Sequence, residues 1–276
     1  MRIVALITAH DEQRFIGPCI EHLRAQGVEV HVTDNGSTDA TVDIARGYLG
    51  DGVIAVEHLP RGRWKDLDAM WGNAERLAAE LGADWYMLQG ADEFRVSPRM
   101  GRTLADELAE ADAAGFNAAS FVEFTFVPCA EAPDHDHDRF LETMRWYYPF
   151  LPHELHNVTA WKARAGPVEL RSSGGQHALL RGLRISRRQL WMRHYQWLSV
   201  EHAMRKYAKH LEDPAAPRSG NWRDRLLAEH VVLPPCAELR RYVADHFLDP
   251  SRPRSTHLLH SSIVSGARDT GRGPAR

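Results

Sequence analysis

Strand-like and helix-like patterns alternate along the first hundred residues, and this alternation restricts the fold more than any other feature of the chain. Short runs rich in β-formers are expected to be strands, and they lie at residues 3–8, 28–33, 53–56 and 84–88. Between them apolar residues recur at helical spacing, most clearly over 67–81. Strands separated by helices predict βαβ units and a parallel sheet. In such a sheet, ligands bind at the carboxyl ends of the strands.

The second half of the chain follows a different pattern. After a strongly apolar strand predicted at 118–127, residues 128–160 are rich in Pro, His, Asp and aromatic side chains, which predicts long loops. The last residues are rich in Gly, Arg and Pro, which is typical of a frayed end. We therefore divide the chain into an α/β half over 1–128, a second half over 129–264 and a flexible tail over 265–276.

The composition excludes several classes of partner. With 34 basic and 37 acidic residues the formal charge is -3, so we predict no nucleic-acid partner. No run approaches the roughly 20 apolar residues of a membrane span, so we predict no transmembrane segment and only peripheral membrane contact. The three cysteines, Cys19, Cys129 and Cys236, are widely spaced and odd in number. This pattern predicts no disulfide framework and a reducing, cytoplasmic location.

The segment after the second predicted strand gathers polar side chains at a strand end. It reads Thr33-Asp34-Asn35-Gly36-Ser37-Thr38-Asp39-Ala40-Thr41. Asp34 places a carboxylate where open α/β sheets bind nucleotides, and it can accept a hydrogen bond from a base N–H or a ribose hydroxyl. An Asn-Gly turn followed by a helix cap has the same composition, so a purely structural role is the alternative.

This segment resembles a signature of the family 2 glycosyltransferases, which have the GT-A fold. The signature is a strand that ends in Asp-x-Gly-Ser-x-Asp-x-Thr, and it is matched by Asp34, Gly36, Ser37, Asp39 and Thr41. Upstream, Thr8-Ala9-His10-Asp11-Glu12 is similar to the family's Asn-Glu loop after the first strand, with Asp11 in place of the usual Asn. The resemblance implies a GT-A-like, mixed and mainly parallel sheet flanked by helices, with a C-terminal acceptor-binding extension.

The resemblance also implies the ligands. Family members typically use a nucleotide-diphosphate sugar and a divalent metal, here Mg²⁺ or Mn²⁺. The residues that it assigns to the nucleotide-sugar are Thr8, His10, Glu12, Asp34, Gly36, Ser37 and Asp92. The first half of the chain is then the donor-binding half, and residues 129–264 bind the acceptor and close the active site.

The family's Asp-x-Asp metal motif is only half present. After the strand at 84–88 the chain reads Gln89-Gly90-Ala91-Asp92-Glu93, so the first carboxylate is replaced by glycine. Residues two apart on an extended segment face the same side, which leaves Asp92 as the predicted metal ligand. The late segment Arg193-His194-Tyr195 resembles the family's His-Tyr segment, so we predict His194 as a second ligand.

Two cationic residues precede the long helix predicted at 67–81. Arg63 and Lys65 lie in the run Arg61-Gly62-Arg63-Trp64-Lys65, where they can contact phosphate or base. A basic loop without a ligand is the alternative.

The general base is the least defined part of the site. Inverting relatives place a carboxylate in a Glu-Asp pair at a helix start about a hundred residues beyond the metal motif, and we identify no such pair at that position. His177, in Ser173-Gly174-Gly175-Gln176-His177, is the first candidate, and Glu123, on an aromatic strand that would raise its pKa, is the second.

The resemblance to the family implies a glycosyltransferase that inverts configuration and is assisted by a metal. Its acceptor carries a hydroxyl and can be a saccharide, a lipid-linked molecule or a small natural product. A nucleotidyltransferase of related sheet architecture is one alternative, although residues 8–12 lack the Gly-rich, basic loop of that class. A catalytically inactive nucleotide-sugar-binding protein is the other, because Gly90 and the missing acidic pair weaken the catalytic set.

Overall fold

The computed structural model describes residues 1–62, 66–153, 157–175, 177–207, 231–243 and 248–257. The chain divides into two compact units: the first contains Met1–Glu123 and His153–His194, and the second contains Phe124–Pro152 and Tyr195–Arg276. All the predicted site residues that the structure describes belong to the first unit. The predicted boundary at 128 does not coincide with this discontinuous division, and the roles assigned to the two halves stay predictions.

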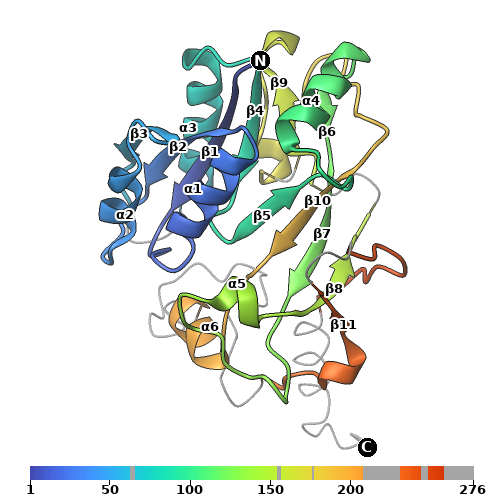
Figure 1. Ribbon diagram of the computed structural model, residues 1–276. Coiled ribbons are helices and arrows are strands. Elements are labelled where there is room, and N and C mark those ends of the chain that lie inside the picture. The colour runs from blue at the N-terminus through green and yellow to red at the C-terminus, as the bar shows by residue number, and fades with distance from the viewer. Residues whose placement is uncertain (63–65, 154–156, 176, 208–230, 244–247, 258–276) are drawn as a thin grey trace, which may run out of the picture. The chain divides into compact units, whose positions relative to one another are not determined.

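The first unit is built on a six-stranded sheet in the order β3-β2-β1-β4-β9-β6 (Figure 1). Its strands are β1 (Ile3–Ala9), β2 (Glu29–Asp34), β3 (Val53–His58), β4 (Trp85–Gln89), β6 (Ala118–Ala119) and β9 (Ala160–Lys162). The first four strands run parallel to their neighbours, and β9 runs antiparallel to β4 and β6. The expected GT-A-like, mixed and mainly parallel sheet is therefore confirmed.

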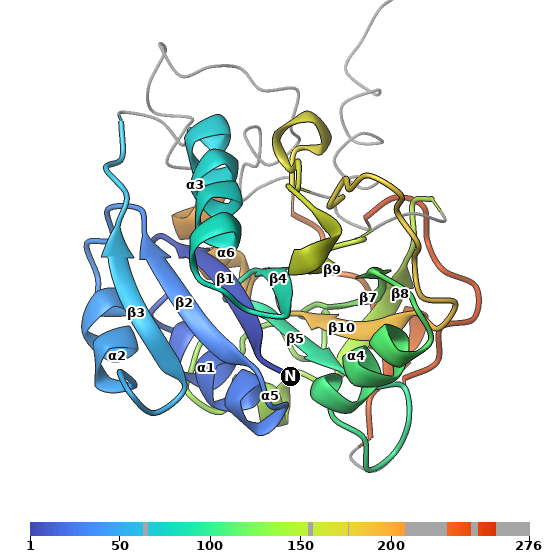
Figure 2. The same ribbon diagram turned by 90° about the horizontal axis from the view of Figure 1, so that it is seen from above.

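Helices cover both faces of the parallel part of this sheet, as Figure 2 shows. α1 (Ile16–Ala25) and α2 (Thr41–Gly47) lie on one face, and α3 (Leu67–Glu80) lies on the other. α3 begins at Asp66, whose carboxylate accepts a hydrogen bond from the Ala69 amide at 3.0 Å. Its buried residues Met70, Ala74 and Leu77 recur at helical spacing, as the sequence predicts for this stretch.

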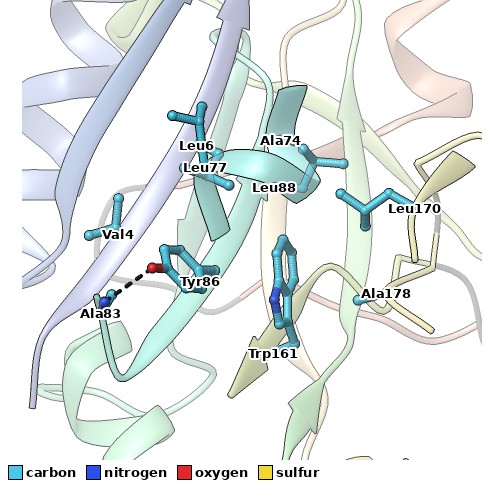
Figure 3. Close-up of a cluster of buried hydrophobic side chains, with 10 residues drawn as sticks. All are labelled: Val4, Leu6, Ala74, Leu77, Ala83, Tyr86, Leu88, Trp161, Leu170 and Ala178. Carbon is cyan, nitrogen blue, oxygen red and sulfur yellow. Dashed lines mark hydrogen bonds between the residues drawn. The ribbon is translucent and has the colours of Figure 1, made fainter. Parts of the chain in front are cut away.

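A core of buried side chains joins α3 to the sheet (Figure 3). Its ten members are Val4, Leu6, Ala74, Leu77, Ala83, Tyr86, Leu88, Trp161, Leu170 and Ala178. Tyr86 on β4 and Trp161 on β9 are opposite each other in the strand register, with ring centroids 6.0 Å apart. The Tyr86 hydroxyl accepts a hydrogen bond from the Ala83 amide at 3.1 Å, so this buried oxygen is satisfied. The sequence pattern predicts no strand at β9.

A second pair of strands in the first unit positions part of the site. β5 (Glu93–Val96) and β10 (Leu190–His194) are antiparallel neighbours, in a register that sets Glu93 opposite His194. β7 (Phe121–Phe126) follows β6 and leaves the first unit after Glu123. Between β5 and β6 lies α4 (Leu104–Ala113), which is capped by Thr103 in a capping box with Asp106.

The second unit contains shorter elements. They are α5 (Phe140–Thr143), β8 (Trp146–Phe150), α6 (Val200–Tyr207), the 3₁₀ turn η6 (Cys236–Glu238) and β11 (Arg240–Arg241), which pairs antiparallel with β8. Ser199 caps α6, because its hydroxyl accepts a hydrogen bond from the His202 amide at 3.0 Å. Among the residues described in both units, no helix combines the length and the apolar character needed to cross a membrane.

One prediction about the cysteines is wrong. Cys129 and Cys236 form a disulfide in the second unit, although 107 residues separate them in the sequence. Both are buried in an apolar cluster that includes Tyr148 and Trp197. The sequence spacing gave no sign of this pair, because only the packing of the second unit brings the two side chains together. Cys19 stays free and is buried in the first unit.

Candidate active site

The two loops that carry the family resemblance bind each other. The Asp11 amide donates to the Ser37 hydroxyl at 3.1 Å, and the Thr38 amide donates to the Asp11 carboxylate at 2.7 Å. The Glu12 amide donates to the Thr41 hydroxyl at 2.8 Å. Asp11 has a positive φ of 54°, a conformation that Asp and Asn tolerate better than most residues. The Ser and Thr of the motif therefore hold the first loop in place at the carboxyl ends of β1 and β2.

Asp34 ends β2 with a nearly buried carboxylate. It accepts hydrogen bonds from the amides of Gly36 at 3.2 Å and Ser37 at 3.0 Å, and His58 Nδ1 lies 3.3 Å from it. Burial by itself would raise the pKa of Asp34, but hydrogen bonds from Ser37, His58 and Gly36 hold the pKa of this carboxyl below its usual value. Asp34 is therefore an anion at neutral pH, with its orientation set by its own turn.

The other predicted donor contacts lie around the same sheet edge. Thr8 and Thr33 are register partners in β1 and β2, and the next pair along the strands is Ala9 and Asp34. His10 follows directly, with its Nε2 atom 3.5 Å from the Asp11 carboxylate. Thus Thr8, His10 and Asp34 gather at the carboxyl ends of neighbouring strands, as predicted for parallel strands.

Glu12 and Gly36 have structural tasks in these loops. The Glu12 carbonyl accepts hydrogen bonds from the amides of Phe15 and Ile16, both at 2.9 Å, at the start of α1. Gly36 has a φ of 74°, and a Cβ atom there would lie 3.1 Å from Arg61 Cβ. The glycine is therefore needed for both the backbone conformation and the close approach of Arg61.

Arg61 is the first cation of the basic run at residues 61–65, of which only Arg63 and Lys65 were predicted as donor contacts. Its guanidinium donates to the side-chain oxygen of Asn35 at 3.1 Å, next to Asp34. The predicted phosphate contacts Arg63 and Lys65 lie outside the described residues. Arg61 belongs to the same basic run and packs against the Asn35-Gly36 turn. This turn is the sequence feature that could have identified Arg61 as a neighbour of the site.

Asp92, His194 and Glu123 come together from three different segments of the first unit. His194 Nδ1 lies 2.7 Å from the Glu123 carboxylate, and His194 Nε2 lies 3.6 Å from the Asp92 carboxylate. Burial by itself would lower the pKa of His194, but the two carboxylates raise its pKa well above the usual value. Asp92 and His194 were predicted as metal ligands, and Glu123 was predicted separately as a base.

His177 lies on a segment beside β4 in the same unit. The Leu88 amide on β4 donates to the Thr159 carbonyl at 2.9 Å, and Val158 forms a parallel bridge with His177. The Ser173 hydroxyl accepts the His177 amide at 3.1 Å, and the imidazole rings of His177 and His153 have centroids 5.4 Å apart. This histidine is thereby held near the end of β4, from which the loop to Asp92 departs.

The first strands and loops of the chain match a known family. Residues 4–67 match the model of the family described as "Glycosyl transferase family 2". This segment belongs to glycosyltransferase family 2. The matched range covers β1 from its second residue, β2, β3 and both interlocked loops, so the resemblance drawn from the sequence is confirmed for this segment.

Solved structures that resemble this chain do so only at low similarity. TarS of S. aureus is 15% identical with a TM-score of 0.43, over 83% of this chain and 42% of that chain. TarS 1-349 in complex with UDP is 15% identical with a TM-score of 0.43, over 83% and 70%. Glucosyl-3-phosphoglycerate synthase from Mycobacterium tuberculosis is 19% identical with a TM-score of 0.31, over 45% and 44%. We derive no ligand or acceptor from these low scores. No curated protein matches the chain.

Asp92 and His194 are the side chains in the first unit that were predicted to hold a divalent metal. Asp92 and His194 offer one carboxylate and one imidazole side by side, and Mg²⁺ or Mn²⁺ at a nucleotide is held by one or two protein ligands together with phosphate oxygens. These residues fit such an ion. Among the described residues, the one group of three metal-ligating side chains is Cys129, Glu131 and Cys236, and its thiols are joined in the disulfide.

The loop at residues 134–138 has a structural explanation. In Asp134-His135-Asp136-His137-Asp138 the His135 ring is buried against the Thr143 hydroxyl at 3.0 Å. Asp136 forms an ion pair with Arg205 on α6. These contacts fix the loop within the second unit.

Proposed function

We propose that the chain transfers a sugar from a nucleotide-diphosphate donor to an acceptor hydroxyl. The observation that carries this proposal is the placement of Asp34 at the end of β2 and of Asp92 after β4. β2 and β4 are the two strands that flank β1 in parallel. Their carboxylates thus stand at the same edge of one sheet within one unit. The family 2 segment spans the first of these two positions.

The donor's parts can be assigned to this edge by charge. Asp34 is an anion that can accept from a nucleobase N–H or a ribose hydroxyl, whereas the diphosphate needs cations. Asp92 and His194 would hold a Mg²⁺ or Mn²⁺ ion, and such an ion stabilises the negative charge that develops on the diphosphate as it leaves. Thr8, His10, Glu12, Gly36 and Ser37 shape the loops around the nucleoside, and Arg61 adds a cation beside Asn35.

The transfer itself requires a base. As the acceptor oxygen forms a bond to the anomeric carbon, the bond from that carbon to the diphosphate breaks and the acceptor's proton passes to a side chain. We propose His177 for this task, with inversion by a single displacement. Glu123 is engaged with His194 and only 4% exposed, which supports a role in orienting that histidine instead of deprotonating the acceptor.

The acceptor and the cellular location of the protein are the next two points. We propose that the second unit binds the acceptor, a saccharide, a lipid-linked molecule or a small natural product, because the donor residues leave it unassigned. The cytoplasmic location also stays a prediction. The Cys129–Cys236 disulfide bears on it, since structural disulfides persist mainly in oxidising compartments. Counting free thiols in protein taken rapidly from cells would decide between the two.

Binding of nucleoside diphosphates tests the function directly. With UDP, GDP, dTDP, CDP and ADP each offered with and without Mn²⁺, we expect one of them to raise the melting temperature, and to raise it more with the metal, because a ligand that binds only the folded state stabilises it. Release of that diphosphate from its sugar conjugate should then depend on an added acceptor. Binding without release would favour the inactive binding protein, and no binding by any of the five would overturn the proposal.

Replacing Glu123 with glutamine is expected to weaken Mn²⁺ binding about 10–100-fold, the usual effect of removing a carboxylate that orients a metal-binding histidine. The measurement is the Mn²⁺ concentration that half-saturates diphosphate release. Glu107→Gln is the matched control, because Glu107 is also 4% exposed but is bonded to Ser97 and Arg99, away from this histidine. Equal Mn²⁺ dependence in the wild type and Glu123→Gln would contradict the orienting role.

A further inference from the structure

Gly90 leaves room for another side chain. Its φ is not in the left-handed region, so the backbone does not require glycine at this position. A Cβ atom on residue 90 would lie 2.9 Å from Asp92 Oδ1, 3.1 Å from Glu93 Cδ and 3.2 Å from Glu93 Cγ. The carboxyl group of Glu93 therefore occupies the space into which a side chain at residue 90 would extend. The Glu93 carboxyl group can take this position only because residue 90 has no side chain.

The Glu93 carboxylate is fixed through one of its two oxygens. Oε2 accepts the Gly90 amide at 3.1 Å and the Arg95 guanidinium at 2.8 Å. Arg95 is only 2% exposed and lies 4.3 Å above the Phe121 ring, and its Nε and Nη1 atoms have no hydrogen-bond partner among the described residues. A buried guanidinium with unsatisfied donors lowers the stability of the fold. A functional role for the Glu93 carboxylate, which Arg95 holds in place, would explain why this unfavourable arrangement is present.

The other oxygen of Glu93 is open to a ligand. Oε1 has no hydrogen-bond partner in the part of the chain that the structure describes, and the side chain is 19% exposed. Glu93 is opposite His194 in the antiparallel register of β5 and β10, and opposite residues project from the same face. The open oxygen therefore belongs to the face that carries His194. Glu93 also directly follows Asp92 in the chain.

We propose that Glu93 binds the nucleotide-sugar donor by accepting a hydrogen bond from a ribose hydroxyl through Oε1. It thereby supplies a second carboxylate beside Asp92, although the residue two positions before Asp92 has no side chain. Gly90 makes the space, and Arg95 holds the carboxylate in one orientation. This inference rests on the proposed function, since it names one contact in the same donor site.

The test combines a change in the protein with a change in the ligand. Calorimetry in the presence of Mn²⁺ compares the nucleoside diphosphate that the wild type binds with its 2′-deoxy and 3′-deoxy analogues. Wild type is expected to lose about 10-fold in affinity when the contacted hydroxyl is removed, as for a hydrogen bond to a charged group. In Glu93→Gln the amide oxygen still accepts from Gly90 and Arg95, but the open position becomes an N–H donor. We expect this variant to bind the ribose and deoxyribose forms with nearly equal affinity.

A matched control separates this contact from a general effect of losing a carboxylate. Glu75 also accepts a backbone amide, that of Leu170 at 2.8 Å, and an arginine, Arg171 at 3.0 Å, and its side chain is 17% exposed. Glu75→Gln is expected to keep the wild-type ratio between the two ligand forms. Because the ratio is measured on one protein sample, it is independent of the fraction that is folded.

The outcomes are distinct. If Glu93→Gln weakens the ribose and deoxyribose forms by the same factor, or weakens neither, Glu93 only supports the loop and the inference is overturned while the proposed function stands. If the wild type binds no nucleoside diphosphate at all, the proposed function itself fails. If the preference for the ribose form is lost in Glu93→Gln but kept in Glu75→Gln, the result supports the contact between Glu93 and the ribose hydroxyl.

Discussion

Replacing Asp92 with asparagine is expected to lower glycosyl transfer on the order of 10³-fold, because it removes the carboxylate charge next to His194 at the point where the diphosphate leaves. Asparagine has the same shape, so the fold is expected to persist with its melting temperature nearly unchanged. The measurement is release of the nucleoside diphosphate with a saturating acceptor, together with far-ultraviolet circular dichroism for the fold.

Asp84→Asn provides the matched control for this experiment. Asp84 precedes β4 at its amino end, where its carboxylate accepts the Arg2 amide at 2.7 Å, and Asp92 follows the same strand at its carboxyl end. Both side chains are half-buried. Turnover of Asp84→Asn should stay within a factor of about two of wild type, since its position is structural. Turnover in Asp92→Asn close to that of wild type would remove this residue from the catalytic site.

Replacing Trp161 with alanine is expected to lower the free energy of unfolding by about 3–5 kcal/mol, the range observed when a large buried aromatic side chain is truncated. Trp161 is 1% exposed, is the register partner of Tyr86 and belongs to the core between α3 and the sheet. The cavity left behind would be bounded by a rigid strand pair, so little of it can close. Unfolding in urea, followed by circular dichroism, measures the loss.

Met100→Ala is the control for apolar truncation at the surface. Met100 is 75% exposed, so its replacement should change the free energy of unfolding by no more than about 0.5 kcal/mol. A loss below about 1 kcal/mol in Trp161→Ala would contradict the central place of this side chain in the core.

Features that depend on short stretches of chain were readable in advance. The four parallel strands and the helices between them follow from apolar periodicity, and Gly27, with a φ of 75°, ends the first helical unit. The caps at Thr103 and Ser199 follow from a polar side chain placed before an amphipathic run. The motif around Asp34 indicated both the family and the edge of the sheet where the site lies, because strand, turn and helix start are consecutive there.

Contacts between distant segments were not readable in this way. His194 and Glu123 are 71 residues apart in the sequence, and nothing in either local pattern indicates that they meet. Strand alternation alone would direct the Glu93 side chain away from the side of Asp92. In the structure it folds back onto the Gly90 amide, because residue 90 has no side chain to prevent it. Trp161 on β9 and the cysteine pair are further cases in which only long-range packing defines the role.

The sequence by itself determined the βαβ order, the family of the first segment and the presence of carboxylates at the ends of β2 and β4, since each depends on residues within one helical turn or one strand. Only the tertiary structure decided which carboxylate orients His194, which one fills the space beside Gly90 and which cysteines join. These pairings form when segments separated by up to 107 residues pack together. The stabilising free energy of such a contact is gained only after the loop between the two segments has been closed, so no local sequence pattern reports it.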